Sequence, residues 1–174
     1  AELAPSLAQE TIQLRDSSGE RAVPEARLTA WFSASGVPFC YSGKRMAPAG
    51  PEGPALRAAR EAVRALSGID YDCCLVNLYS HGKVGMRFHQ DPGQGEAFTH
   101  DTHVVSLGCA RTFVVRAAVD HSARFEFPLR HGDVVHMFGD CQASYQHGVR
   151  VERHEEDAGG RISLVFKQTL APGR

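Results

Sequence analysis

Two histidines and one aspartate have the residue types and spacing that a redox-active metal site requires. His89 and Asp91 lie two positions apart, and on a β-strand residues i and i+2 point to the same face. Such a pair is common by chance, so a site also needs a third ligand, and His147 is well placed to supply it from a distant strand. Two histidines and a carboxylate on one face of an iron ion leave positions open for a chelating co-substrate and dioxygen. This set indicates oxygenase chemistry.

The other histidines offer competing ligand sets. His100 and His103 border an Asp-Thr pair, and this His-Asp-Thr-His run could also hold a metal. The remaining histidines lie beside turn residues or charges, where solvent-facing or hydrogen-bonded structural roles are more common. They are His81, His121, His131, His136 and His154. A closed structural zinc site is disfavoured, because it would more naturally use thiolates and a fourth protein ligand.

A second candidate site lies near the end of the chain, where a final strand would carry two cations on one face. With a period of two, that face holds Arg161, Ser163, Val165 and Lys167. A guanidinium binds a carboxylate in a forked, charge-assisted pair, so Arg161 can anchor a dicarboxylate. The alternative is a solvated arginine and lysine flanking the strand, and only the metal pattern favours the anchor.

The elements that must position these residues are short strands. From Tyr71 onward, runs rich in Val, Phe and Leu alternate with Gly, Asp and His, which is typical of an all-β sandwich or barrel. The expected strands are Cys74 to Tyr79, Val84 to His89, His103 to Leu107, Thr112 to Arg116, Phe125 to Leu129, Asp133 to Phe138 and Ile162 to Gln168.

One helix is expected from Pro54 to Leu66, and a second, shorter one from Glu25 to Phe32 is possible. The apolar face of the first would consist of Leu56, Ala59, Val63 and Leu66. The fold class is therefore α+β, mostly β: a jelly-roll core (a double-stranded β-helix) with one or two N-terminal helices packed outside. We expect one domain over residues 1–174, with an N-terminal extension at 1–70 and the jelly-roll core at 71–170.

Composition limits the classes of partner and compartment. The net charge is −1, which disfavours a protein that binds mainly through many phosphate contacts. The five cysteines are odd in number and lack CxxC spacing, so we expect reduced thiols in an intracellular protein of the cytoplasm or nucleus. An organelle stays open, since a targeting segment could precede Ala1. Without an apolar run of about 20 residues, we expect no membrane span, and we expect a monomer.

The ordered set of motifs resembles the AlkB family of nucleic-acid demethylases, over about Pro24 to Gln168. In chain order the motifs are Arg27 to Phe32, Tyr41 to Gly43, Asn77 to Tyr79, Gly82, His89 to Asp91, Val105 to Gly108, His131 to Val135, His147-Gly148 and Arg161 to Lys167. Each motif is weak alone, but the whole ordered set is specific.

The resemblance implies an iron(II)- and 2-oxoglutarate-dependent dioxygenase that demethylates N-alkylated bases in DNA or RNA. The implied iron ligands are His89, Asp91 and His147. Arg161 would pair with the distal carboxylate of 2-oxoglutarate, and further co-substrate contacts would come from Asn77, Tyr79, Ser163 and Lys167. The aromatic residues matching those around the target base are Trp31, Phe39 and Tyr41, for which a local hydrophobic cluster is the alternative. The stretch Ser106 to Gly108 and the turn His131 to Asp133 match structural positions.

Three departures from the family pattern affect these expectations. The usual Arg-x-Asn-x-x-x-Arg has Ser163 and Lys167 in place of its Asn and second Arg, so a charge is kept but forked geometry is lost. Gly93 stands where some members carry an acidic residue, so base recognition must differ. The polar loop Gly93 to Thr102 is expected to border the substrate channel.

Several readings of the substrate stay open. An enzyme that acts on a base needs it flipped out or unpaired, and the near-neutral charge favours single-stranded DNA or RNA. One alternative keeps the oxygenase chemistry and changes the substrate to a protein or small molecule, because fold alone does not determine function. Another is an inactive nucleic-acid-binding module on an oxygenase fold.

Overall fold

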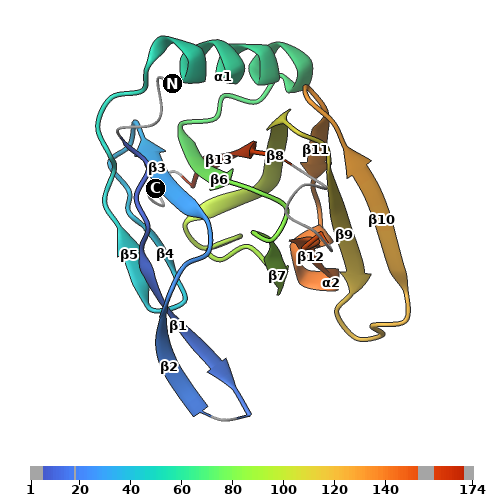
Figure 1. Cartoon of the computed structure of the whole chain (residues 1–174). Coiled ribbons are helices and arrows are strands. Elements are labelled where there is room, and N and C mark those ends of the chain that lie inside the picture. The colour runs from blue at the N-terminus through green and yellow to red at the C-terminus, as the bar shows by residue number, and fades with distance from the viewer. Residues whose placement is uncertain (1–5, 18, 153–158, 171–174) are drawn as a thin grey trace.

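Two antiparallel sheets pack face to face in the computed structural model, which describes residues 6–17, 19–152 and 159–170 (Figure 1). The larger sheet contains, in spatial order, β11 (Val134–Met137), β8 (Phe98–Gly108), β13 (Arg161–Thr169), β6 (Cys73–Tyr79) and β3 (Leu28–Ser33). The smaller sheet contains β10 (Arg124–Leu129), β9 (Arg111–Ala117), β12 (Tyr145–Val149) and β7 (Met86–His89). The mostly β architecture expected from the sequence is confirmed.

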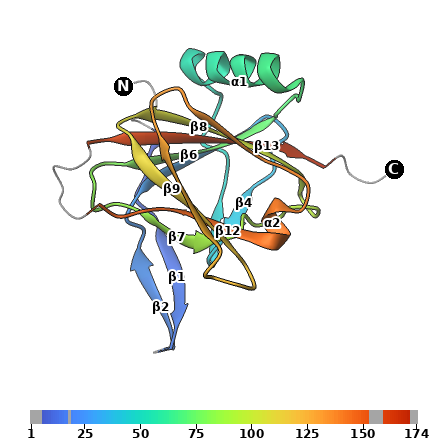
Figure 2. The ribbon, with the colours of Figure 1, turned by 90° about the vertical axis from the view of Figure 1, so that its right-hand side faces the viewer.

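Two hairpins stand apart from the sheets. One pairs β1 (Thr11–Asp16) with β2 (Gly19–Pro24), and the other pairs β4 (Phe39–Tyr41) with β5 (Lys44–Met46). The β1–β2 hairpin projects away from the sandwich in both ribbon views (Figure 2). Because β3 lies between these hairpins in the sequence, the polypeptide before the core lies partly outside the two sheets and partly within the larger one.

The expected long helix is present as α1 (Pro54–Ser67) and covers the outer face of the larger sheet (Figure 2). Leu56 and Val63 are buried in an apolar cluster with residues of β3, β6 and β13. The helix ends at Gly68, whose φ of +73° favours glycine and whose N–H donates to Arg64 O. Leu66 is 67% exposed, so the apolar face is narrower than predicted.

The predicted helix from Glu25 to Phe32 is wrong, because most of this stretch forms β3 at the edge of the larger sheet. Both faces of β3 are covered: Trp31 packs between the sheets, whereas Ala30 and Phe32 pack under α1. A strand buried on both faces loses the alternation of polar and apolar residues, which makes it resemble a buried helix.

Two further differences lie close to the candidate ligands. The sequence prediction missed β12, which carries His147, and the one-turn helix α2 (Cys141–Ser144) before it. The stretch Gly93 to Thr102 is not a loop throughout, because β8 begins at Phe98, which is buried. Within the described residues, no helix is long and apolar enough to cross a membrane.

Candidate active site

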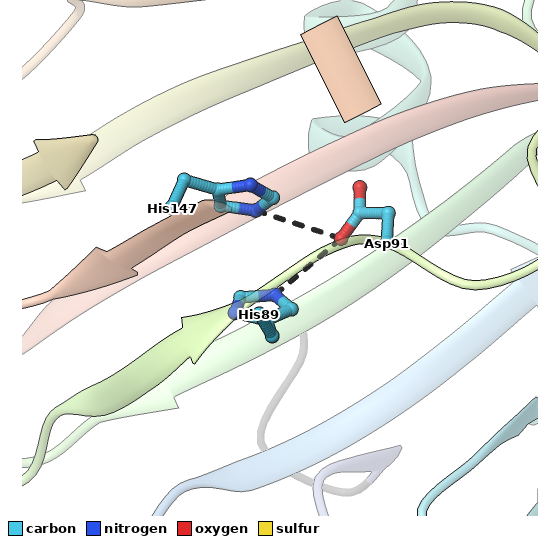
Figure 3. Close-up of side chains that lie close together, drawn as sticks. All are labelled: His89, Asp91 and His147. Carbon is cyan, nitrogen blue, oxygen red and sulfur yellow. Dashed lines mark ion pairs between the residues drawn. The ribbon is translucent and has the colours of Figure 1, made fainter. Parts of the chain in front are cut away.

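His89, Asp91 and His147 come together between the sheets, as the spacing predicted (Figure 3). The Nε2 atom of His89 lies 3.5 Å from Asp91 Oδ1, and the Nε2 atom of His147 lies 3.6 Å from the same oxygen. These separations are short enough for the three atoms to share one ion at about 2.1 Å each. Among the described residues this is the one group of three or more potential ligands that meets at a point.

Strand pairing accounts for the convergence of the two histidines. β7 and β12 are neighbours in the smaller sheet, and His147 is directly opposite His89. The Nδ1 atom of His89 lies 3.0 Å from Arg87 O, a pure acceptor, so Nδ1 carries the proton and Nε2 is free to coordinate. Asp91 is not on a strand face as expected but two residues beyond β7, where Gln142 accepts a hydrogen bond from its backbone N–H.

A buried lysine controls the charge of the aspartate. Lys167 Nζ lies 2.8 Å from Asp91 Oδ2 and 3.4 Å from Thr102 Oγ1, and its side chain has no exposed surface. Burial alone would raise the pKa of Asp91, but Lys167 and the two histidines outweigh it and hold that pKa well below its usual range. Burial lowers the pKa of His147. An ionised carboxylate and neutral imidazoles are the protonation states that metal binding requires.

Arg161 has a free hydrogen-bonding position, which fits a carboxylate anchor. It starts β13 and is 1% exposed, and its Nε donates to Ser106 Oγ at 2.8 Å. Its buried Nη1 finds no hydrogen-bond partner among the described residues. An unsatisfied buried guanidinium nitrogen is costly unless a ligand pairs with it. Burial lowers the pKa of Arg161, although an arginine stays charged.

One cavity of about 500 Å³ joins the metal-ligand group to Arg161. Nine of the predicted site residues line it: Phe39, Tyr41, Asn77, Tyr79, His89, Asp91, His147, Arg161 and Ser163. Asn77 Nδ2 donates to Ser163 Oγ at 3.2 Å, so the serine that replaces the usual asparagine is part of the wall. Lys167 does not line the cavity and contacts Asp91 instead, which differs from its expected contact with the co-substrate.

Part of the cavity wall is a buried ionic network that the sequence did not predict. Glu25 is 1% exposed and accepts hydrogen bonds from Tyr41 Oη at 2.9 Å and Lys44 Nζ at 3.0 Å. Arg27 Nη2 lies 2.6 Å from Glu25 Oε1, and Arg27 Nε donates to Asn77 Oδ1 at 2.8 Å. This network connects the N-terminal hairpins to the co-substrate end of the cavity. The sequence does not reveal this network, because two of its hydrogen bonds join residues that are 16 and 50 positions apart.

Trp31 does not have the exposure expected of a base-binding residue. Its ring is fully buried, stacks on Phe39 with centroids 4.7 Å apart, and donates from Nε1 to Val37 O. Trp31 is absent from the cavity wall, whereas Phe39 and Tyr41 line it. The structure therefore supports the cluster alternative for Trp31, which holds Phe39 from behind.

The alternative metal site, the run from His100 to His103, does not bring three potential metal ligands together within the described part of the chain. His103 lies on the α1 side of the larger sheet, hydrogen-bonds Tyr71 Oη through Nδ1 at 2.6 Å, and stacks on His136. Asp101 pairs with His136 at 2.7 Å. His154 lies outside the described residues. The two stretches that were expected to have structural roles, Ser106 to Gly108 and His131 to Asp133, lie in contact. The backbone N–H of Gly108 donates a hydrogen bond to Nδ1 of His131.

Comparison with known proteins supports the same chemistry. The profile of the 2OG-Fe(II) oxygenase superfamily matches residues 8–167. The human alpha-ketoglutarate-dependent dioxygenase alkB homolog 3 is 29% identical over 151 residues, which are 82% of this chain and 51% of that protein. The chain belongs to the AlkB family of this superfamily. It is thus an iron(II)- and 2-oxoglutarate-dependent dioxygenase. The two histidines and the aspartate fit an iron ion, and the unpaired Arg161 nitrogen fits a carboxylate of 2-oxoglutarate.

Other members of the AlkB family and one uncharacterized protein also match more than four fifths of this chain. Uncharacterized protein R406 of Acanthamoeba polyphaga mimivirus is 34% identical, over 84% of this chain and 74% of that one. Human DNA oxidative demethylase ALKBH2 is 25% identical, over 83% and 57%. A solved structure of OsALKBH1 superposes with a TM-score of 0.52 at 20% identity, over 82% and 78%, which confirms the jelly-roll fold. The chain spans about half the length of its alkB homolog 3 relatives.

Proposed function

We propose that this chain removes alkyl groups from the nitrogens of DNA or RNA bases by oxidation, preferentially on single strands. The observation that carries the proposal is a single cavity whose wall includes the ligand group, the carboxylate anchor and the aromatic rings of Phe39 and Tyr41. The name of the ALKBH2 relative, a DNA oxidative demethylase, agrees with this substrate class. When bound, iron and 2-oxoglutarate supply the activation of dioxygen.

Each residue of the cavity has a proposed role. The iron ligands are His89, Asp91 and His147. Arg161 pairs with the distal carboxylate of 2-oxoglutarate through its unpaired Nη1, and the adjoining polar contacts come from Asn77, Tyr79 and Ser163. Lys167 orients Asp91 instead of binding the co-substrate.

The substrate end is built by the N-terminal extension. Phe39 and Tyr41 would lie against the target base, with Trp31 behind them. A base reaches the cavity only when it leaves a stack, which costs a few kcal/mol in a duplex and less in a single strand. The net charge of −1 agrees with a single-strand preference, since a near-neutral protein gains little from extended phosphate contacts.

The proposed domain division follows from where these roles lie along the chain. Residues 1–174 act as one oxygenase domain, in which the extension at 1–70 recognises the substrate and the core at 71–170 holds the metal and co-substrate. All five cysteines are free thiols, in keeping with an intracellular location in cytoplasm or nucleus. The expectation of a monomer stays a prediction.

The deciding experiment is a turnover assay with iron(II), ascorbate and 2-oxoglutarate on oligonucleotides that carry 1-methyladenine, 3-methylcytosine or N6-methyladenine. Single-stranded and duplex forms of each are compared, and Asp91→Ala is the inactive control. We expect loss of the methyl group and release of formaldehyde, faster on single strands and absent in the control. Succinate without demethylation would redirect the search to a protein or small-molecule substrate. Tight oligonucleotide binding without any succinate would support the inactive binding module.

A further inference from the structure

Positive side chains outnumber negative ones around the cavity that holds the metal-ligand group. Among the described residues, the carboxylates and guanidinium groups of its lining are Glu25, Arg27, Arg87, Asp91 and Arg161. Each of the two carboxylates also contacts a buried lysine that does not line the cavity. Lys167 Nζ lies 2.8 Å from Asp91 Oδ2, and Lys44 Nζ lies 3.0 Å from Glu25 Oε2. The negative charges are thus neutralised by the lysines, and the arginines are in excess.

The Glu25 network, which consists of Glu25, Arg27, Tyr41 and Lys44, places part of this excess beside an aromatic ring. Glu25 contributes one negative charge, and Arg27 and Lys44 contribute one positive charge each, so the network has a net charge of +1. Burial lowers the pKa of Lys44, but the contacts with Glu25 oppose that shift. Burial raises the pKa of Tyr41, so its hydroxyl stays neutral. Lys44 Nζ and the guanidinium carbon of Arg27 lie 4.9 Å and 5.8 Å from the centroid of the Tyr41 ring.

The network leaves a hydrogen-bond donor available, but its carboxylate is fully engaged. Arg27 Nε donates to Asn77 Oδ1 and Nη2 contacts Glu25 Oε1, which leaves Nη1 without a partner among the described residues. Glu25 Oε1 is held by Arg27 and Tyr41, and Oε2 by Lys44 and Tyr41. Because a guanidinium donates and never accepts, the wall fits a ligand with an acceptor such as a carbonyl oxygen.

The metal end of the cavity does not offset the positive charge. A bound iron(II) ion and the two carboxylates of 2-oxoglutarate would neutralise each other, and Lys167 already neutralises Asp91. The segment after Asp91 adds no second carboxylate, because it continues with Pro92 and Gly93. A substrate stacked on Tyr41 therefore meets a wall that is positive overall.

We propose that the site selects alkylated bases that are neutral and carry a carbonyl oxygen beside the alkylated nitrogen, over the cationic bases 1-methyladenine and 3-methylcytosine. Examples are 3-methyluracil, 3-methylthymine and 1-methylguanine, whose carbonyl would accept from Arg27 Nη1. Like-charge repulsion rejects the cations. At an effective dielectric constant of about 20, two unit charges about 12 Å apart already change an affinity about tenfold. The inference rests on the proposed function, of which it narrows the substrate class.

A matched pair of bases tests this preference by binding, without turnover. 3-Methyluracil and 3-methylcytosine share the ring and the methylated nitrogen, but C4 bears an oxygen in the first and an amino group in the second, and only the second is cationic at neutral pH. Short single-stranded oligonucleotides that differ in this one base are titrated into the protein with Mn²⁺ and 2-oxoglutarate, in the absence of dioxygen. We expect 3-methyluracil to bind at least about tenfold more tightly.

The outcomes separate this inference from the proposed function. Equal or tighter binding of 3-methylcytosine would overturn the inference and leave the proposed function intact. If neither methylated base bound more tightly than its unmethylated counterpart, both would be overturned.

Two substitutions in the Glu25 network should move the preference in opposite directions. Lys44→Met lowers its net charge to zero and should reduce the preference for 3-methyluracil, whereas Glu25→Gln raises that charge to +2 and should increase it. Arg45→Met removes an exposed charge from the same hairpin and should keep the wild-type preference. The ratio of the two affinities is measured within each protein, so a general loss of binding does not mimic the result. If one variant folds poorly, the other carries the test, and an unchanged ratio would overturn the inference.

Discussion

At the scale of single residues, two roles for Lys167 can be compared: holding Asp91 ionised through their contact, or binding the co-substrate. Lys167→Met removes the cation that keeps Asp91 ionised, so the pKa of Asp91 should rise and its affinity for a divalent metal should fall. Removing one partner of a buried pair also costs roughly 3–5 kcal/mol in unfolding free energy. We expect weaker Mn²⁺ binding by calorimetric titration and a lower urea midpoint for the metal-free protein.

Lys167→Arg is the matched control, because it restores the charge and the residue usual in the family. It should bind Mn²⁺ nearly as well as the wild type. If Lys167→Met instead left Mn²⁺ binding intact and only raised KM for 2-oxoglutarate, the lysine would be a co-substrate ligand, as the sequence first indicated.

A second residue-scale prediction concerns His103, which is hydrogen-bonded to Tyr71 and is not part of the metal-ligand group. Burial, with His136 beside it, lowers the pKa of His103 below its ordinary value of 6.5. As pH falls through 6.5, the unfolded chain takes up a proton at this residue before the folded protein does, so stability is lost. The stability present above that pH should therefore decrease between about pH 7.5 and about pH 5.5.

Urea unfolding at both pH values checks this, with His103→Gln expected to show a smaller decrease than the wild type. His121→Gln, at an exposed turn residue, serves as the control and should keep the wild-type decrease. Equal decreases in all three proteins would show that His103 does not contribute to the pH dependence.

At the scale of elements, the close approach of β12 to β7 brings the two histidines together. A Cβ at Gly148 would lie 2.7 Å from Met86 O and 3.2 Å from Arg87 O, so the glycine permits this spacing. Gly148→Ala should push the strands apart, separate His147 from His89 and weaken Mn²⁺ binding at least about tenfold, which corresponds to ~1.4 kcal/mol. Gly160→Ala is the control, because its nearest atom is 3.7 Å away. Equal Mn²⁺ affinity in both variants would contradict this account.

The same strand shows what the sequence could and could not reveal. Strands with repeated Val, Leu and Phe, such as β6 and β9, were predicted nearly to their ends because their patterns are local. β12 reads Tyr-Gln-His-Gly-Val, without an apolar alternation, and forms because β7 and β9 flank it. The metal ligands, Arg161 and Ser163 were named from their types and spacing, whereas the other predicted residues of the cavity came from the resemblance to the family. The Glu25 network and the Gln142 contact were missed, because they depend on packing between distant segments.

At the scale of the whole molecule, the proposed metal site connects the two sheets. His89 and His147 belong to the smaller sheet, whereas Asp91 is tied through Lys167 to β13 of the larger sheet. A bound ion would therefore hold the two layers together. Metal binding should then stabilise the complete fold and not only the local strands.

Because a bound ion would stabilise the complete fold, adding Mn²⁺ should raise the unfolding temperature. At a concentration about 100 times Kd, binding contributes about 2.7 kcal/mol. For a domain of this size, each kcal/mol shifts Tm by about 2–4 °C, so the expected rise is roughly 5–11 °C. Chelation with EDTA should reverse it, and Asp91→Ala should show no rise. A rise of equal size in Asp91→Ala would mean that the ion binds elsewhere, because the variant lacks the one oxygen that both histidines face.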